Sequence, residues 1–140
     1  MLRMNMKLRH KNGLIPYDKI SRTVTLRTME GVYSSKKYEY NGIFFRSKWE
    51  VKIAGWFDSL GMRWKYEPLF FKLSNGRHYI PDFQLVDSGE FAEVKGFLRD
   101  ADRYAMDDFV MSGRILWYFD RRNIDVPSFN MRWGDGISNR

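Results

Sequence analysis

Apolar side chains recur at a helical spacing in the middle of this chain. They are mostly three or four residues apart, and they are Trp49, Ile53, Trp56, Phe57 and Leu60. Ser47 precedes this run and Gly61 follows it. Serine is a favoured N-cap residue and glycine a favoured residue after a helix end, so the pattern predicts a helix over residues 47–60.

Shorter runs, alternating or apolar and divided by turn residues, predict β-strands. Residues 38–45 are typical of a hairpin around Asn41-Gly42. Further strands are predicted over residues 63–67, 69–73, 77–80, 83–86 and 91–95. Pro81 lacks a backbone N–H and should stand at a strand start or bend.

The remaining third of the chain predicts one more helix and one more strand. Residues 101–111 are expected to be helical, with Asp100 as the cap and Gly113 after the end. Residues 115–119 are apolar and aromatic enough for a buried strand, and the last twenty residues are expected to be loop and tail. The fold class predicted is α/β: a mixed, mostly antiparallel sheet of four or five strands, with both helices packed against it.

The domain organisation follows from composition and charge. The chain has 140 residues, of which 44% are hydrophobic, enough for one core and too few for two. Residues 1–37 contain nine Lys and Arg against two acidic residues, whereas residues 38–140 contain fifteen of each sign. We therefore expect a basic N-terminal arm over 1–37, in which only 21–27 alternates like a strand, and a single domain over 38–140.

The basic arm has two interpretations. A cluster of cations favours a polyanionic partner such as nucleic acid. The same composition is also typical of a solvated tail that only keeps the protein in solution. Charge alone does not separate them.

Several classes of protein are disfavoured by what the sequence lacks. With no cysteine, the chain has neither disulfides nor thiolate metal sites, which fits a reducing cytosol. It has two histidines, too few for most imidazole-rich zinc sites, and no apolar run near the roughly 20 residues that span a bilayer. We expect a soluble, cytoplasmic protein without a membrane partner.

Two carboxylates and a lysine are predicted to meet on one hairpin. If the turn over residues 87–90 is a two-residue loop, Asp82 lies opposite Lys95 and Gln84 lies opposite Glu93. Because side chains alternate along a strand, these four would share one face, used for chemistry, while the other face joins the core. Asp82 and Glu93 could then converge on a hard divalent cation such as Mg²⁺, with Lys95 beside it, which is the equipment for metal-assisted phosphodiester cleavage.

Each member of this group also has an ordinary interpretation. Aspartate after proline is often turn chemistry, and an alternating Glu93-Val94-Lys95 is an ordinary half-exposed strand. Ser47 and Glu50 match a capping box, which could be the only role of Glu50. Glu50 also lies at the edge of the apolar face of its helix, so it could lean toward the sheet and the metal. The combination, more than any single residue, favours the metal site.

The motifs resemble a known family. They are Phe45-Arg46-Ser47-x-x-Glu50, Gly61-x-x-x-x-Tyr66-Glu67, Tyr79-x-Pro81-Asp82-Phe83 and Glu93-Val94-Lys95-Gly96. Over about residues 44–104 they resemble the PD-(D/E)XK nuclease superfamily. The nearest members are compact phage enzymes, namely endonuclease I-like Holliday-junction resolvases and phage or intron homing endonucleases.

The resemblance implies a fold, an activity and a set of site residues. It implies a restriction-endonuclease-like core, with Glu50, Asp82 and Glu93 as carboxylates, the Val94 carbonyl as a further metal ligand and Lys95 steadying the water or the phosphate. The cofactor would be Mg²⁺, with Mn²⁺ as a substitute, and the protein would be phage-encoded and act in the host cytoplasm. Predicted DNA contacts are Arg3, Lys7, Arg9, Lys11, Arg22, Arg27, Lys36, Lys37, Arg46 and Lys48.

The activity expected is that of a metal-dependent DNA endonuclease that resolves branched DNA. A sequence-specific homing endonuclease is the alternative within the superfamily, and a non-catalytic DNA-binding protein that kept the fold is a third. A homodimer is expected for either nuclease, because two strands must be cut and one chain has one site.

Overall fold

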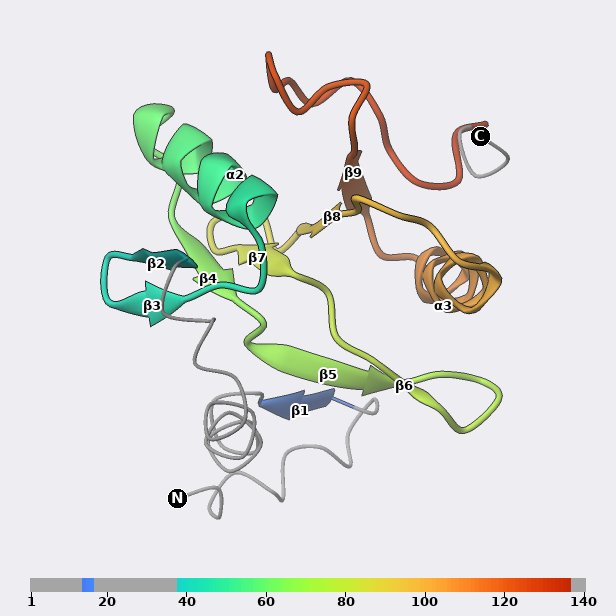
Figure 1. Cartoon of the computed structure of the whole chain (residues 1–140). Coiled ribbons are helices and arrows are strands. Elements are labelled where there is room, and N and C mark those ends of the chain that lie inside the picture. The colour runs from blue at the N-terminus through green and yellow to red at the C-terminus, as the bar shows by residue number, and fades with distance from the viewer. Residues whose placement is uncertain (1–13, 17–37, 137–140) are drawn as a thin grey trace.

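The computed structural model describes residues 14–16 and 38–136. Its helices are α2 (Lys48–Ser59) and α3 (Asp100–Met111). Its strands are β1 (Leu14–Pro16), β2 (Glu39–Tyr40), β3 (Ile43–Phe44), β4 (Trp64–Tyr66), β5 (Leu69–Lys72), β6 (His78–Tyr79), β7 (Phe83–Leu85), β8 (Phe91–Val94) and β9 (Leu116–Phe119). Figure 1 shows their arrangement.

A four-stranded sheet in the order β4-β7-β8-β9 forms the centre of the molecule. The pairs β4–β7 and β7–β8 are antiparallel, and β8–β9 is parallel. Parallel neighbours need a crossover connection, and α3 provides it between β8 and β9. The prediction of a mixed, mostly antiparallel sheet with two helices is confirmed.

The two helices cover opposite faces of this sheet (Figure 1). One core contains Ile53 and Phe57 of α2 packed with Ala92 and Val94 of β8. The other contains Phe109 of α3 and its neighbours, packed with Phe91 of β8. The alternation along β8 sends its side chains to both cores. The predicted core face is confirmed, but the face expected for chemistry also contributes Phe91 to a second core, so it is not used for chemistry alone.

Strands β5 and β6 leave the central sheet and pair with β1 in a second sheet, ordered β1-β5-β6. Two features redirect the chain. Glu67 has a φ of 46°, in a region uncommon for non-glycine residues, and is followed by Pro68. Pro81 stands between β6 and β7, at the bend predicted for it. The meander expected to form one sheet thus divides between two, and the predicted strand 21–27 lies outside the described residues.

The hairpin between β7 and β8 has a longer loop than the sequence suggested. Leu85 N–H donates to the carbonyl of Glu90, and this hydrogen bond closes a loop with four residues, 86–89, inside it. Gln84 therefore pairs with Phe91 and not with Glu93 as predicted. The observed register differs from the predicted one by two residues. Because side chains alternate between faces with a period of two, every residue lies on its predicted face.

The helix boundaries agree with the sequence pattern at three of four ends. Ser47 caps α2, its hydroxyl accepting from Glu50 N–H, and the chain leaves that helix through Gly61 at a φ of 72°. Asp100 was predicted to cap α3, but it is the first helical residue and Arg99 is the N-cap. The carboxylate that meets this helix start is Asp102, which accepts from Arg99 N–H at 2.9 Å.

The segment after β9 is irregular, as predicted, but it is not a free tail. Trp133 is 2% exposed and packs on Tyr118, with ring centroids 5.0 Å apart. Its backbone N–H donates to Leu116, and its indole N–H donates to Asp107 of α3. Trp133 thus fastens the C-terminal segment to β9 and α3. Across the described residues, no helix is long and apolar enough to cross a membrane.

Replacing Trp133 with Ala should lower the free energy of unfolding by about 3–5 kcal/mol, since a large buried aromatic side chain is removed. Denaturant unfolding followed by far-UV circular dichroism measures this. Val126→Ala, in the same segment but 82% exposed, is the control and should change stability by less than about 0.5 kcal/mol. Equal, small effects of both changes would mean that the segment is not part of the core.

Candidate active site

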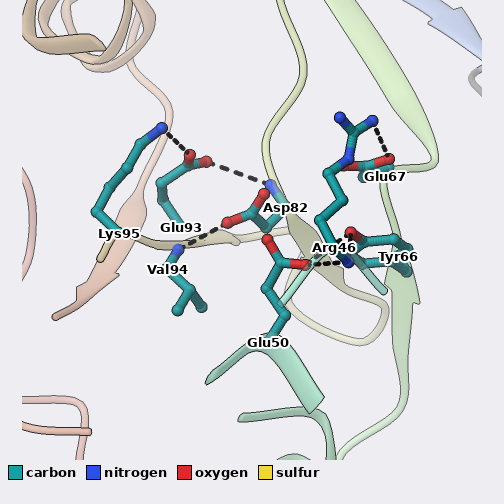
Figure 2. A network of polar contacts seen from close by, with 8 residues as sticks. All are labelled: Arg46, Glu50, Tyr66, Glu67, Asp82, Glu93, Val94 and Lys95. Atoms are coloured by element: carbon teal, nitrogen blue, oxygen red, sulfur yellow. Dashed lines mark hydrogen bonds and ion pairs between the residues drawn. The ribbon is translucent and has the colours of Figure 1, made fainter. Parts of the chain in front are cut away.

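A cavity of about 450 Å³ opens where β7 begins and β8 ends. Its lining includes every residue that the sequence predicted for catalysis and metal binding: Glu50, Asp82, Glu93, Val94 and Lys95. Figure 2 shows Glu50 reaching from α2 toward Asp82, while Glu93 and Lys95 approach from β8 and its end. The structure therefore brings the predicted residues together from three elements.

Asp82 is held in place by two neighbouring segments, β8 and the residue that follows β4. Its Oδ2 accepts from Val94 N–H at 2.7 Å, and its carbonyl accepts from Glu67 N–H at 2.8 Å. Its own N–H donates to Glu93 Oε1 at 3.3 Å. Pro81 would face Val94 in a continued ladder, but the Val94 N–H turns to the carboxylate instead. Asp82 thus closes the hairpin end where the strands separate.

Glu93 is 3% exposed and has a partner on each oxygen. The hydroxyl of Tyr79 donates to Oε1 at 2.7 Å, and Lys95 Nζ lies 3.2 Å from Oε2. The same Lys95 Nζ lies 3.3 Å from Oδ1 of Asp102 on α3. The lysine is therefore fixed between two carboxylates, with its charge at the cavity.

Glu50 combines the two roles left open by the sequence. Its Oε1 accepts from Arg46 N–H at 2.9 Å and from the Tyr66 hydroxyl at 2.8 Å. This resembles a capping box moved by one residue, because the backbone donor is Arg46 and not the N-cap Ser47. The carboxylate nevertheless lines the cavity, 6% exposed, and points toward Asp82 (Figure 2).

Glu67 is a buried acid of this site to which the sequence assigned no role. It is 5% exposed, and both of its oxygens meet the Arg46 guanidinium, at 2.9 and 3.1 Å. Two-point contact of this kind fixes the plane of a guanidinium. The sequence showed only that Glu67 precedes Pro68, whereas its unusual backbone conformation, which can mark a site, is seen in the structure alone.

Burial raises the pKa of the three acids of the cavity, and neighbouring charges add to it for Asp82 and Glu50. Burial, followed by the charges of Glu93 and Glu50, raises the pKa of Asp82 well above its usual range. Burial raises the pKa of Glu93, and Lys95 only partly opposes this. Burial also raises the pKa of Glu50 to about 7, with the Tyr66 hydroxyl opposing.

The pKa of Lys95 is also raised, but the cause is different. Burial alone would lower its pKa, but the charges of Glu93, Asp102 and Asp82 outweigh burial and raise it. The lysine therefore stays protonated at neutral pH. Acidic residues outnumber basic ones in the cavity lining, which includes Glu50, Glu67, Asp82, Glu93 and Asp102 against Arg46, Arg77 and Lys95.

The residues fit a hard divalent cation of the Mg²⁺ type in their chemistry. Within the described residues, no hydrogen bond reaches Asp82 Oδ1 or Glu50 Oε2, which leaves both oxygens available as ligands. In the same part of the chain, no group of three or more His, Cys, Asp or Glu is arranged around a single metal position. Magnesium usually keeps several waters and takes one or two carboxylates, so two available oxygens meet its needs. Magnesium ligation stays a prediction.

Two of the ten predicted DNA contacts lie in the described residues. Arg46 lines the cavity, and Lys48 is exposed at the start of α2. The other eight lie outside the described residues.

A scan against family models, a search of curated proteins and a search of solved structures each found no match. The resemblance to a superfamily therefore depends on the sequence motifs alone.

In chelating buffer the stability of the protein should fall as pH rises from about 4.5 to about 7. Folded Glu50 keeps its proton until about pH 7, whereas the unfolded residue loses it near 4.5, so the folded state binds more protons in that window. The loss from Glu50 amounts to about 3 kcal/mol. Glu50→Gln keeps an acceptor for Arg46 and Tyr66 but has no carboxyl group to ionise, so this variant should not show that loss of stability.

Chemical denaturation at pH 5 and pH 8 provides the comparison. The stability of Glu50→Gln relative to wild type should rise between these pH values, whereas exposed Glu39→Gln should follow wild type. A difference between Glu50→Gln and wild type that is the same at both pH values would contradict the placement of Glu50 among buried acids.

Proposed function

We propose that the protein is a Mg²⁺-dependent DNA endonuclease that hydrolyses phosphodiester bonds. The observation that carries the proposal is the group of three buried carboxylates, Glu50, Asp82 and Glu93, held in one cavity beside a charged lysine. Burying several acids together is costly unless a cation accompanies them. A structural role alone would be met by apolar side chains at lower cost.

The residues predicted for the site each have a role in this proposal. Asp82 and Glu50, each with one oxygen that accepts no hydrogen bond among the described residues, would hold the cation, with Glu93 and the Val94 carbonyl as further ligands that the family resemblance implies. When bound, the cation lowers the pKa of a water and offsets the charge of a phosphate. Lys95, oriented by Glu93 and Asp102, donates a hydrogen bond to a phosphate oxygen as negative charge develops there.

The finer part of the proposal is the substrate. We assign the protein to branched DNA, with a restriction-endonuclease-like core and a homodimer that cuts two strands. The family resemblance supports these points, together with the excess of basic residues in 1–37. Sequence-specific cleavage of duplex DNA, as by a homing endonuclease, is the alternative that the second experiment below separates.

The first experiment tests the residues. Glu93→Gln keeps an acceptor for Tyr79, and Lys95→Ala removes the charge; each should lower plasmid nicking at least about a hundredfold in Mg²⁺. Binding of the same DNA in Ca²⁺ and the melting temperature should stay near wild type. Lys65→Ala, exposed on β4, is the control and should nick normally. Nicking that survives in both site variants would refute the assignment of the site.

The second experiment tests the substrate. A four-way junction and a long linear duplex of mixed sequence are offered in parallel with Mg²⁺ and with Mn²⁺. We expect paired cuts near the branch point and little cleavage of the duplex. Cleavage of the duplex at one recurring sequence, with the junction left intact, would favour the homing alternative instead.

A further inference from the structure

A second cavity, of about 460 Å³, adjoins the candidate active site. Lys95 lines both cavities, so the two meet at that residue. The second cavity is built from the segment between β8 and α3, from α3 itself and from the residues that follow β9. None of its residues apart from Lys95 has a role in the proposed cleavage.

The charges of the two cavities are opposite. The second cavity is lined by Lys95, Arg103, Arg121 and Arg122, with Asp120 as its only acid among the described residues. Asp120 is already engaged by the Arg122 guanidinium at 2.8 Å, and Arg121 is exposed. A concave site with this excess of positive charge suits a phosphate group.

Exposed aromatic side chains stand at both cavities. Phe97, between β8 and α3, is 74% exposed and lines the basic cavity. Tyr104 of α3 is 71% exposed and lines the acidic one. Aromatic faces beside a positively charged groove are the usual equipment of proteins that bind single-stranded nucleic acid, because bases stack on the rings.

We propose that the basic cavity binds a phosphate next to the scissile one on an unpaired stretch of DNA, with Phe97 and Tyr104 stacking on bases to either side of Lys95. In an intact duplex the bases are stacked on one another, and separating them is costly. Unpaired bases present their faces without that cost. The inference rests on the proposed function and defines its substrate: DNA with unpaired nucleotides at the cut, as in a flap, a gap or an opened branch.

Binding in Ca²⁺ tests this, using a single-stranded oligonucleotide that contains 2-aminopurine and a duplex of the same sequence. Arg121→Ala should weaken binding to the single strand and reduce the slope of log K against log salt by about one unit. Phe97→Ala and Tyr104→Ala should each weaken it about fivefold or more, with less quenching of 2-aminopurine and little change on duplex. Arg121→Lys should restore most of the affinity.

The controls are exposed residues of similar type away from both cavities. Arg63→Ala on the approach to β4 and Met111→Ala at the end of α3 should bind like wild type. Wild-type binding by all three test variants overturns the inference, as does an equal loss on single strand and duplex. A change in sedimentation by Phe97→Ala, with binding unchanged, also overturns it and assigns the aromatic surface to a contact between copies of the chain.

The same assays distinguish the inference from the proposed function. If the test variants lose single-strand binding but the wild-type protein cuts no DNA, the second cavity stands as a binding site and the nuclease proposal fails. If the wild-type protein cuts DNA and the three variants bind every substrate normally, the nuclease proposal stands and the inference fails.

Discussion

The arrangement of the candidate site depends on how Asp82 ends the hairpin of β7 and β8. Its carboxylate accepts a hydrogen bond from Val94 N–H, and its carbonyl accepts one from Glu67 N–H. Its own N–H donates to the Glu93 carboxylate. Pro81, which has no N–H, prevents the ladder from continuing past this point. The hydrogen bonds that a longer sheet would use are met by a carboxylate, so the acid becomes part of the backbone scaffold and its second oxygen faces the cavity.

The same scaffold keeps several acids close together at an electrostatic cost. Tyr66 of β4 donates to Glu50, and Tyr79 of β6 donates to Glu93. Each acid therefore has a neutral hydrogen-bond donor that a neighbouring strand holds in place. These hydrogen bonds offset part of the burial but do not neutralise the charge, and the pKa values remain raised. A site of this kind is less stable than an apolar core would be. In the proposed function, a cation that binds to the folded state alone would recover that energy.

The sequence predicted the site better than the details around it. The spacing of Asp82, Glu93 and Lys95 predicted all three on one face. This prediction stayed correct although the predicted pairing of β7 with β8 was wrong, because the error was two residues and side chains alternate with a period of two. The loop length was wrong because a two-residue and a four-residue turn leave similar sequence signals. Glu67 was assigned no role, since its importance comes from a positive φ and from Arg46, which lies 21 residues earlier.

The C-terminal segment illustrates the same limit at the level of the fold. Its glycines, asparagines and proline are typical of a loop, and the irregular backbone agrees. Trp133 has no periodic neighbours, so nothing in the local pattern indicates that it is buried. Its partners, Asp107 and Tyr118, come from other elements, and only the tertiary structure brings them within reach.

The central claim is that the acidic cavity is a cation site, and anomalous diffraction from a crystal grown with Mn²⁺ tests it most directly. The account predicts an anomalous peak in the cavity at coordinating distance from the Asp82 carboxylate, and no such peak in a crystal of Asp82→Asn grown in the same way. A wild-type crystal without manganese in this cavity, or with manganese bound only elsewhere, would contradict the account.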